Sequence, residues 1–504
     1  MKVLKKHSLW SVTGLLAFTL LLVFNVEPKD PVVGKALAIT VLMAIWWVTE
    51  AVPLAVTALL PVILFPILGV MDGKAITTTY FNNIIFLFMG GFIMALAMER
   101  WNLHNRIALQ IVNWIGVSPG RILMGFMVST AFLSMWMSNT ATTMMMLPIA
   151  MSVATKLKDL INSKESVSHY AIGLFLSIAY SSSIGGMATL VGTPTNMVMV
   201  KIQDILFAGA PEISFTQWLM FALPLSVTMI GVTWLLIYFI FRPKKRWHEL
   251  NYDSFDVYFK RMGKMTYEEK WVLSLFGMLV LAWIFRPGIK INDFFLPGWA
   301  DLFSNKNFIS DGTTAILFSV ILFLIPSKNK KGKMLMDWKT ANKLPWNIVL
   351  LFGGGFALAK GFESSGLSVW LGEQMQFGEY FPSALSLLLI IILMSFLTEL
   401  TSNVASTTIL LPVFAGIAIS KNIHPYFYMI PLTLAANLAF MLPTATPGNA
   451  IVFGTGKISI RQMMKTGILL NMIGVLLVLL ISITLLKWVF EISVHELPSW
   501  AILK

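Results

Sequence analysis

The amino-acid sequence predicts an all-α polytopic membrane protein with about eleven transmembrane helices, two re-entrant helical hairpins and an inverted-topology repeat. Of its 504 residues, 57% are hydrophobic and only 12% are charged, a composition that soluble globular domains do not have. The apolar residues are gathered in long stretches. Inside this apolar sequence one short polar phrase occurs twice, as Ser138-Asn139-Thr140 and as Ser402-Asn403-Val404.

The apolar stretches mark the expected crossings, each compatible with the ~20 residues that a helix needs to span hydrocarbon. They lie near residues 9–25, 33–50, 52–70, 82–98, 170–201, 215–241, 271–286, 311–325, 346–361, 426–454 and 466–490. The first stretch follows Lys2, Lys5 and Lys6, in the manner of a signal peptide. Because Glu27-Pro28-Lys29 comes after it, with no small-residue cleavage site, we expect an uncleaved first helix.

Two further apolar stretches, 119–155 and 382–420, are too long for one crossing and carry the polar phrase at their middle. We expect each arm to have about 15 residues and to be about 22 Å long, which is short of the ~30 Å of hydrocarbon. A re-entrant helical hairpin with its tip near mid-membrane fits these lengths better than two full crossings.

The charged residues predict the orientation. The formal net charge of +13 would suit a nucleic-acid-binding protein, but the basic residues collect in loops between the apolar stretches. That distribution follows the positive-inside rule of polytopic membrane proteins. The basic segments are 156–164, 242–270, 328–343 and the cluster of Lys457, Arg461 and Lys465. We therefore expect a multi-pass protein of the cytoplasmic membrane, with a cytoplasmic N-terminus, an extracytoplasmic C-terminus and no nucleic-acid partner.

The two polar phrases lie 264 positions apart, and their surroundings repeat at the same offset. The matched pairs are Asn83 and Asn347, Phe88 and Phe352, Gly90-Gly91-Phe92 and Gly354-Gly355-Phe356, Glu99 and Glu363, and Pro148 and Pro412. Because a hairpin adds no crossing, an odd number of crossings separates the two copies, which then run in opposite directions. Inverted repeats are typical of secondary transporters with a binding site near the midplane.

Two of the expected crossings are interrupted. Residues 171–200 contain Gly192-Thr193-Pro194-Thr195-Asn196, and residues 425–456 contain Pro443-Thr444-Ala445-Thr446-Pro447-Gly448-Asn449. The two Thr-Pro-x-Asn pieces correspond at an offset of 253. Proline and glycine interrupt the hydrogen bonds of a helix, and unwound backbone at membrane depth is tolerated only against protein or a cavity. We expect a broken helix in each half.

These elements predict an anion site that uses no fixed cation. Hairpin tips present helix N-termini, which favour anions, and Asn139, Asn403, Thr140 and Thr193 add amide and hydroxyl donors. Residues 122–155 and both broken segments contain no Lys, Arg, Asp or Glu. Because burying an uncompensated dianion is costly, co-bound cations would supply the missing charge. The pattern favours a cation-coupled anion carrier.

The paired Ser-Asn-Thr-type phrases, each followed by a Thr-Pro-x-Asn break, resemble the divalent anion:sodium symporter family of di- and tricarboxylate carriers. The resemblance covers nearly the whole chain. It implies a homodimer in the lipid bilayer, Na⁺ as coupling ion with no other cofactor, and substrates such as succinate, malate, 2-oxoglutarate or citrate. It also implies a scaffold part and a transport part that moves as an elevator.

The scaffold part would comprise residues 1–117 and 271–378. The transport part would comprise 118–241 and 379–490, with a cytoplasmic loop at 242–270 and an extracytoplasmic tail at 491–504. We expect the segments 99–116 and 362–378 to form interfacial arms between the two parts.

The resemblance also assigns site residues by position. The first sodium site would use Ser134, Ser138, Asn139 and the backbone at Gly192. The second would use Thr398, Thr401, Asn403 and the backbone at Ala445. The substrate carboxylates would contact Asn139, Thr140, Thr193, Asn403, Val404, Thr446 and Pro447. Val404 departs from the pattern because the repeat expects threonine there, so one hydroxyl donor is lost and substrate selectivity should depend on this position.

Several alternatives stay open. A sodium-independent dicarboxylate exchanger of the same fold would have the same motifs. A membrane-embedded hydrolase lacks support, because no His-Glu-x-x-His or Gly-x-Ser-x-Gly motif occurs, and opposed hairpins would tend to block a channel. Glu399 is the one charged residue within 383–420. It is either a functional carboxylate, in cation binding or a proton relay, or a structural one that bonds neighbouring amides.

Overall fold

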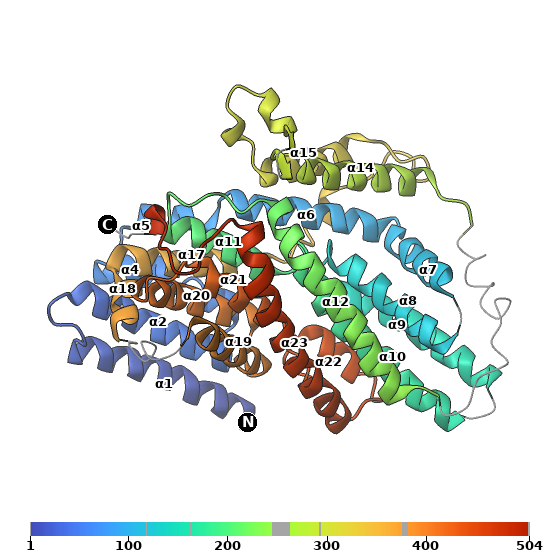
Figure 1. Cartoon of the computed structure of the whole chain (residues 1–504), viewed down its shortest axis with the longest axis horizontal. Helices are drawn as coiled ribbons and strands as arrows, with labels where there is room; N and C mark the ends of the chain where they lie inside the picture. Colours follow the sequence, from blue (N-terminus) through green and yellow to red (C-terminus); the bar gives the residue numbers. More distant parts are fainter. Residues whose placement is uncertain are drawn as a thin grey trace.

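The computed structural model describes residues 2–116, 118–161, 164–243, 263–291, 294–374 and 382–501. Most of the predicted cytoplasmic loop 242–270 and the end of the predicted tail 491–504 lie outside the described residues, as do positions 375–378 of the second predicted arm. The described chain is built from helices packed around buried apolar side chains (Figure 1).

The first half of the chain contains the helices up to α12. They are α1 (Lys2–Phe24), α2 (Pro31–Thr49), α3 (Leu54–Thr57), α4 (Leu60–Leu68), α5 (Gly73–Thr77), η1 (Thr78–Tyr80), α6 (Asn83–Arg100), α7 (Leu103–Ile115), α8 (Pro119–Ser134), α9 (Asn139–Leu160), α10 (Lys164–Met187), α11 (Pro194–Leu206) and α12 (Phe215–Phe241).

The second half begins at α14. Its elements are α14 (Tyr267–Ile284), β1 (Ile289–Ile291), β2 (Phe294–Leu296), η2 (Trp299–Leu302), η3 (Lys306–Phe308), α15 (Asp311–Leu324), α16 (Trp338–Ala341), α17 (Trp346–Ser365), α18 (Leu367–Gln374), α19 (Ser383–Leu400), α20 (Asn403–Ser420), α21 (Tyr426–Ala435), α22 (Pro447–Phe453), α23 (Ile460–Val489) and η4 (Ser499–Ala501).

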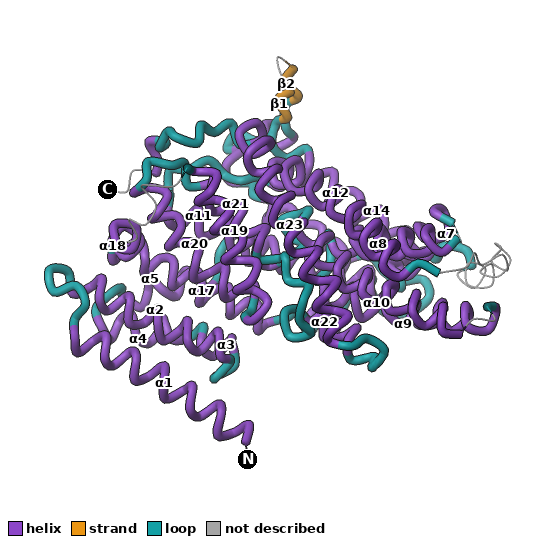
Figure 2. Tube along the Cα trace, turned by 60° about the horizontal axis from the view of Figure 1, so that its bottom comes forward, coloured by secondary structure: helices purple, strands orange, loops and turns teal. Residues whose placement is uncertain are grey.

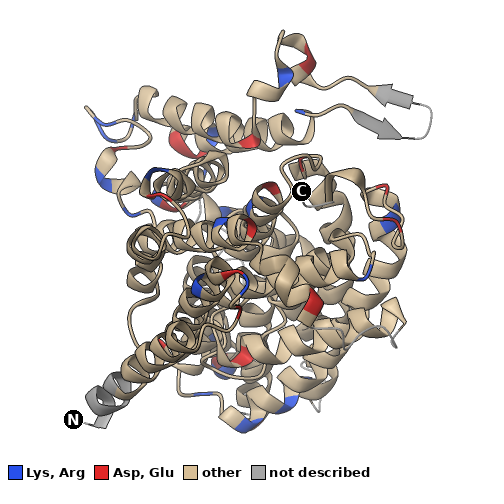
Figure 3. Ribbon diagram, turned by 90° about the vertical axis from the view of Figure 1, so that its left-hand side faces the viewer, with Lys and Arg blue, Asp and Glu red and all other residues tan. Residues whose placement is uncertain are grey.

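The all-helical membrane class is confirmed. Within the described residues, seven helical segments are long and apolar enough to cross a membrane, and four shorter apolar helices accompany them. The count of about eleven crossings stays a prediction. One small departure is the antiparallel ribbon of β1 and β2, paired from Ile289 with Leu296, which projects from the helical body (Figure 2). Charged residues lie mainly at helix ends and in loops (Figure 3).

Both predicted helix breaks are present. In the first half, α10 ends at Met187 and α11 begins at Pro194; in the second half, α21 ends at Ala435 and α22 begins at Pro447. Each proline occupies the first helical position, where its missing N–H removes no helical hydrogen bond.

A third break, which was not predicted from the sequence, divides the expected crossing 52–70 into α3 and α4. Pro61 has no N–H to donate to the carbonyl of Thr57 four residues earlier, so the helical hydrogen bonding is interrupted at this point. The hairpin arms also differ from expectation: α9 has 22 residues, and α19 and α20 have 18 each, instead of about 15. Arm length alone therefore does not separate a hairpin from two crossings, and the depth of the tips stays a prediction.

The two halves interlock around α6 and α17. Gly90 of α6 packs against Ala315 of α15, so closely that a Cβ atom would lie 2.6 Å from the Ala315 Cβ. Its repeat partner Gly354, on α17, packs in the same way against Ala58, which follows α3. Each half thus supplies the helix against which the other half packs.

Between these two contacts the rings of Phe88 and Phe352 meet edge to face, with centroids 5.1 Å apart. Phe88 and Phe352 occupy equivalent repeat positions. A residue that touches its own repeat partner lies next to the axis that relates the two copies. An axis relating the two copies would therefore run between α6 and α17.

Candidate functional site

Each hairpin tip is held by the same hydrogen bond. In the α8–α9 hairpin, Ser134 Oγ donates to Asn139 Oδ1 at 2.7 Å. In the α19–α20 hairpin, Thr398 Oγ1 donates to Asn403 Oδ1 at 2.5 Å. Both bonds join a hydroxyl to the asparagine five residues later, at equivalent repeat positions. The amide oxygen accepts this bond, so the amide NH₂ group of each asparagine is directed elsewhere.

The broken helices repeat a second pattern. Asn196 Nδ2 donates to the carbonyls of Gly186 and Thr189, at 3.4 and 2.8 Å. Asn449 Nδ2 donates to the equivalent carbonyls of Ala439 and Leu442, at 3.1 and 3.0 Å. The asparagine of each Thr-Pro-x-Asn motif therefore satisfies carbonyls that the break leaves without a helical partner. This role explains why the motif ends in asparagine.

The hairpin of each half packs against the broken helix of the other half. At the start of α22, Gly448 lies against Thr143 of α9 and Ser182 of α10, where a Cβ atom would be 3.1 and 3.3 Å from their hydroxyls. In the opposite pair, α11 packs against α20. The four helices that begin at the polar motifs, α9, α11, α20 and α22, thus meet in crossed pairs.

A direct polar contact joins the two breaks. Thr193 Oγ1, just before α11, donates to Asn437 Oδ1 of the second-half break at 3.2 Å. Asn437 Nδ2 in turn donates to Thr195 Oγ1 at 3.0 Å and to the Thr433 carbonyl at 3.1 Å. Asn437 is buried and was not among the predicted site residues. It connects the predicted site residue Thr193 to the second half.

The predicted first sodium set comes together. A Cβ atom on Gly186 would lie 2.4 Å from Asn139 Oδ1, and one on Gly192 would lie 2.9 Å from the Ser134 carbonyl oxygen. Ser134, Asn139 and Gly192 therefore lie close together, in packing that leaves no room for a side chain at Gly186 or Gly192. Ser138 lies at the same turn, where its hydroxyl accepts the Ala141 N–H at 3.2 Å and caps α9.

The predicted second sodium set is partly assembled. Thr398 Oγ1 contacts Asn403 and also lies 2.9 Å from the Ala436 carbonyl oxygen. Thr401 Oγ1 is engaged within its own hairpin, by the Leu397 carbonyl at 2.8 Å and by Ser406 Oγ at 2.5 Å. Ala445 is buried in the break.

The predicted carboxylate-binding residues lie at the ends of the four helices. Asn139, Thr140, Asn403 and Val404 are half-buried, and each begins its helix or follows the first residue. Thr193 and Thr446 are buried, and Thr446 Oγ1 caps α22 by accepting the Asn449 N–H at 3.2 Å. Pro447 is exposed.

Glu399 is buried, and three N–H donors occupy its carboxylate. Oε1 accepts the backbone N–H of Met441 at 2.8 Å and Asn471 Nδ2 at 2.7 Å, and Oε2 accepts the N–H of Leu442 at 3.0 Å. Met441 and Leu442 belong to the second-half break, and Asn471 belongs to α23. Of the two alternatives for Glu399, these contacts match the structural one, in which the carboxylate bonds neighbouring amides.

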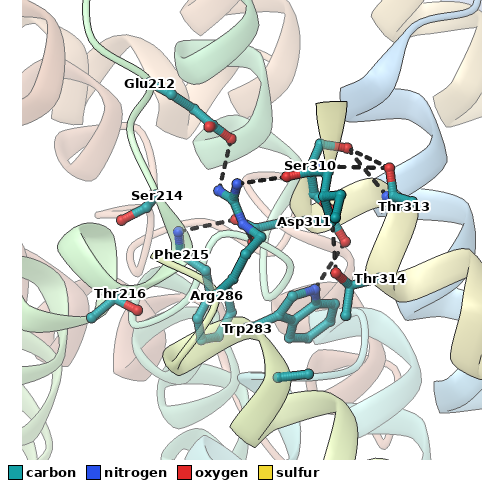
Figure 4. A network of polar contacts seen from close by, with 12 residues as sticks. Glu212, Ser214, Phe215, Thr216, Trp283, Arg286, Ser310, Asp311, Thr313 and Thr314 are labelled. Atoms are coloured by element: carbon teal, nitrogen blue, oxygen red, sulfur yellow. Dashed lines mark hydrogen bonds and ion pairs between the residues drawn. The ribbon is translucent and has the colours of Figure 1, made fainter. Parts of the chain in front are cut away.

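An ion-pair network at the start of α12 was also missed (Figure 4). The buried Arg286 guanidinium bridges Glu212 Oε1, 2.9 Å from Nη2, and Asp311 Oδ1, 2.5 Å from Nε. Asp311 Oδ2 accepts the N–H of Phe215 at 3.2 Å. The network ties the first residue of α12 to the ends of α14 and α15. Its members are far apart in the sequence, and the only sequence signal was an ionisable residue at the boundary of an apolar stretch.

Taken together, paired hairpins, paired broken helices and a polar centre at the interface between the halves define a multi-pass membrane transporter rather than an enzyme. A family model for the sodium:sulfate symporter transmembrane region matches residues 6–492. The chain belongs to this family, as the resemblance predicted.

Two relatives are similar over almost their whole length. The sodium-dependent dicarboxylate transporter SdcS of Staphylococcus saprophyticus is 43% identical over 96% of this chain and 92% of its own length. SdcS of Staphylococcus aureus is 42% identical, with the same coverage.

Two solved structures share the fold at low identity. The YdaH transporter of Alcanivorax borkumensis has a TM-score of 0.58 at 13% identity, over 82% of this chain and 87% of its own. MtrF of Neisseria gonorrhoeae, described as illuminating a class of antimetabolite efflux pumps, has a TM-score of 0.53 at 10% identity, over 83% and 84%.

Proposed function

We propose that this chain is a sodium-coupled secondary transporter of C4 and C5 dicarboxylates such as succinate, malate and 2-oxoglutarate. The observation that carries the proposal is the crossed packing of α9 with α22 and of α11 with α20, which gathers both polar motifs at the interface of the halves. The family and the sodium-dependent dicarboxylate transporters among its relatives support the same substrate class.

The substrate would be held by helix ends and neutral donors. The helices α9, α11 and α20 all begin at the motif residues, and their first N–H groups carry a positive partial charge. Asn139 and Asn403 each have an amide NH₂ group to donate, because the oxygen of each amide already accepts a hydroxyl. One carboxylate of the dianion would contact each hairpin tip.

Sodium ions fit the groups around the tips. Hydroxyl, amide and backbone carbonyl oxygens are the hard, neutral ligands that coordinate alkali cations at unwound transporter helices. Within the described part of the chain, Asn196 Oδ1 and Asn449 Oδ1 are buried with no hydrogen-bond partner. Such oxygens are more stable beside a cation than unpaired. Co-transported sodium would neutralise the dianion, because residues 122–155 and 383–420 contain no Lys or Arg to do so.

Transport would proceed by elevator-type alternating access in a homodimer. All the motif elements fall within residues 118–241 and 379–490, the proposed transport part, which would move against a scaffold of 1–117 and 271–378. The Arg286 network lies at the border of these parts, since Glu212 and Phe215 belong to the first and Arg286 and Asp311 to the second. α7 and α18 would act as the arms between them.

Reconstituted vesicles test the proposal. Purified protein is placed in vesicles, and uptake of labelled succinate is measured with an inward sodium gradient, with equal sodium on both sides, and with potassium only. We expect accumulation only with the sodium gradient, and competition by malate and 2-oxoglutarate. Citrate and sulfate complete the substrate panel.

The same vesicles distinguish sodium-coupled symport from dicarboxylate exchange. Uptake that requires internal dicarboxylate and ignores the sodium gradient would replace this proposal with a sodium-independent exchanger. A current far above carrier turnover would indicate a channel.

A further inference from the structure

A cavity lies away from the hairpin tips, between α9, α10 and the connection from α22 to α23. Its volume is about 270 Å³, whereas a single water needs only roughly 10–15 Å³. The cavity beside Asp311 measures about 20 Å³. Thr155 is 16 residues along α9 from Asn139, which corresponds to about 24 Å of helix, so the cavity is distinct from the proposed dicarboxylate site.

Two lysines from opposite halves line this cavity. Lys158 belongs to the basic segment 156–164, and Lys457 to the basic cluster that follows α22. The fold brings these two basic segments together because α22 packs against both α9 and α10 (Figure 2). Within the described residues neither lysine is ion-paired, so both ammonium groups are available to an anion.

The rest of the lining suits a phosphate carried on an apolar body. Thr155 and Ser168 place hydroxyl oxygens beside the lysines, with Thr155 Oγ1 donating to the Met151 carbonyl at 3.0 Å, and no lining residue is acidic. The remaining lining residues, Ala154, Ala171 and Ile172, form an apolar surface. The Lys457 ammonium lies 5.4 Å from the centre of the Phe175 ring, a cation–π contact that restrains it near the cavity. A lipid phosphate would also cover this apolar surface with its acyl chains, whereas a free phosphate would use only the lysines.

We propose that this cavity binds a phosphate group at the predicted cytoplasmic side, supplied by an anionic lipid headgroup or by free phosphate. Lysine is a flexible point charge that suits phosphate oxygens. Anionic lipids gather in the cytoplasmic leaflet and interact favourably with each basic residue near its surface. Because the two lysines come from the two halves, a bound phosphate would join the hairpin arm of the first half to the broken helix of the second.

The test compares two double variants. K158Q/K457Q removes the lysines of the cavity. K156Q/K465Q removes two charges from the same basic segments at positions that do not line the cavity, and is the matched control. The purified proteins are mixed with phosphatidylglycerol or phosphatidylcholine in detergent, and bound lipid is counted by native mass spectrometry. A parallel thermal-shift series uses inorganic phosphate.

We expect K158Q/K457Q to weaken phosphate-group binding by roughly tenfold or more, and K156Q/K465Q to match the wild-type protein. Loss confined to phosphatidylglycerol assigns the site to a lipid headgroup, and loss of stabilisation by inorganic phosphate assigns it to soluble phosphate. The site is overturned if the two double variants behave equally. It is also overturned if the wild-type protein neither prefers phosphatidylglycerol to phosphatidylcholine nor is stabilised by inorganic phosphate. Symmetrical size-exclusion peaks for both variants show that they are folded.

Discussion

In each half of the molecule, hydrogen bonds connect the hairpin to the broken helix at an equivalent place, but the groups that form these bonds differ between the halves. In the first half a hydroxyl makes the connection: Thr189 Oγ1 donates to the backbone carbonyl of Met135 at 2.5 Å and accepts the N–H of Gly192 at 3.1 Å. In the second half, Met135 is replaced by Glu399 and Thr189 by Leu442, at the offsets of 264 and 253. There the Glu399 carboxylate accepts two backbone N–H groups from the break.

The difference shows that the duplication preserved a geometric restraint and not a particular bond. The proposed binding of a dianion at a hairpin tip requires that the break beside the tip stays in register. In the first half the bonds are between neutral groups, each worth about 1 kcal/mol net. In the second half a carboxylate replaces them and also binds Asn471 of α23, so three elements depend on one side chain. The second half should be the more fragile one.

The largest expected effect concerns the asparagine that both hairpin tips share. N139A and N403A should each abolish succinate uptake, because each removes the amide donor of one tip and the partner of Ser134 or Thr398. The measurement is sodium-driven uptake in vesicles, with the size-exclusion profile as the control for folding and assembly. If both alanine variants transported normally, the site would be assigned to the wrong residues.

A second comparison tests how much the connections made by Glu399 and Thr189 each contribute to stability. E399A should lower the free energy of unfolding by about 3 kcal/mol or more, since it leaves the buried donors of Met441, Leu442 and Asn471 unpaired. T189V should cost about 1–2 kcal/mol. The thermal midpoint in detergent reports both, and E399Q, which keeps an acceptor oxygen, should fall between E399A and the wild-type protein.

Equal destabilisation by E399A and T189V would show that the halves are equally robust. A well-folded E399Q protein with no transport would instead restore the functional interpretation of Glu399.

A third pair examines the hydroxyl at each tip. S134A and T398A should each raise the sodium concentration for half-maximal uptake by roughly 3- to 10-fold, the effect of losing one hydrogen-bonding group of about 1 kcal/mol. The maximal rate should change less. S152A, an exposed serine further along α9, serves as control. An effect confined to one of the two variants would mean that only one tip binds a cation.

The smallest effect concerns Val404, the position where the second tip lacks a hydroxyl. V404T should lower the KM for succinate by roughly 2- to 10-fold, because it restores one donor, and T140V should raise it by a similar factor. Competition among succinate, malate and 2-oxoglutarate shows whether selectivity changes too. Unchanged KM and selectivity in both variants would remove this position from the substrate contacts.

Local sequence signals predicted the broken helices and the hairpin turns. Pro194 and Pro447 have no backbone N–H to donate and therefore favour the start of a new helix, and the exact repeat offsets separated Asn139 and Asn403 from ordinary polar residues between helices. Pro61 carries the same kind of signal but stands beside no polar motif, and the break between α3 and α4 was not predicted.

Contacts between segments that are distant in the chain could not be predicted from the sequence. Arg286 finds its partners 74 and 25 residues away, at Glu212 and Asp311, and Asn437 finds Thr193 at a separation of 244. No periodicity links such positions, because their proximity depends on how whole helices pack. The length of α9 was underestimated for a related reason: the helix continues through the polar residues up to Leu160, where hydropathy no longer marks it.

The meeting of Phe88 and Phe352 bears on how such a molecule arose. In a symmetric pair of half-length chains, these two rings would be one side chain touching its own copy across the symmetry axis. Any substitution there would have acted on both rings at once, as would any change at a hairpin tip. In a single chain the two positions are coded separately, so Glu399 and Val404 can differ from Met135 and Thr140 while Phe88 and Phe352 stay the same. One chain can therefore keep an identical contact between its halves and still hold the two ends of an unsymmetrical substrate differently.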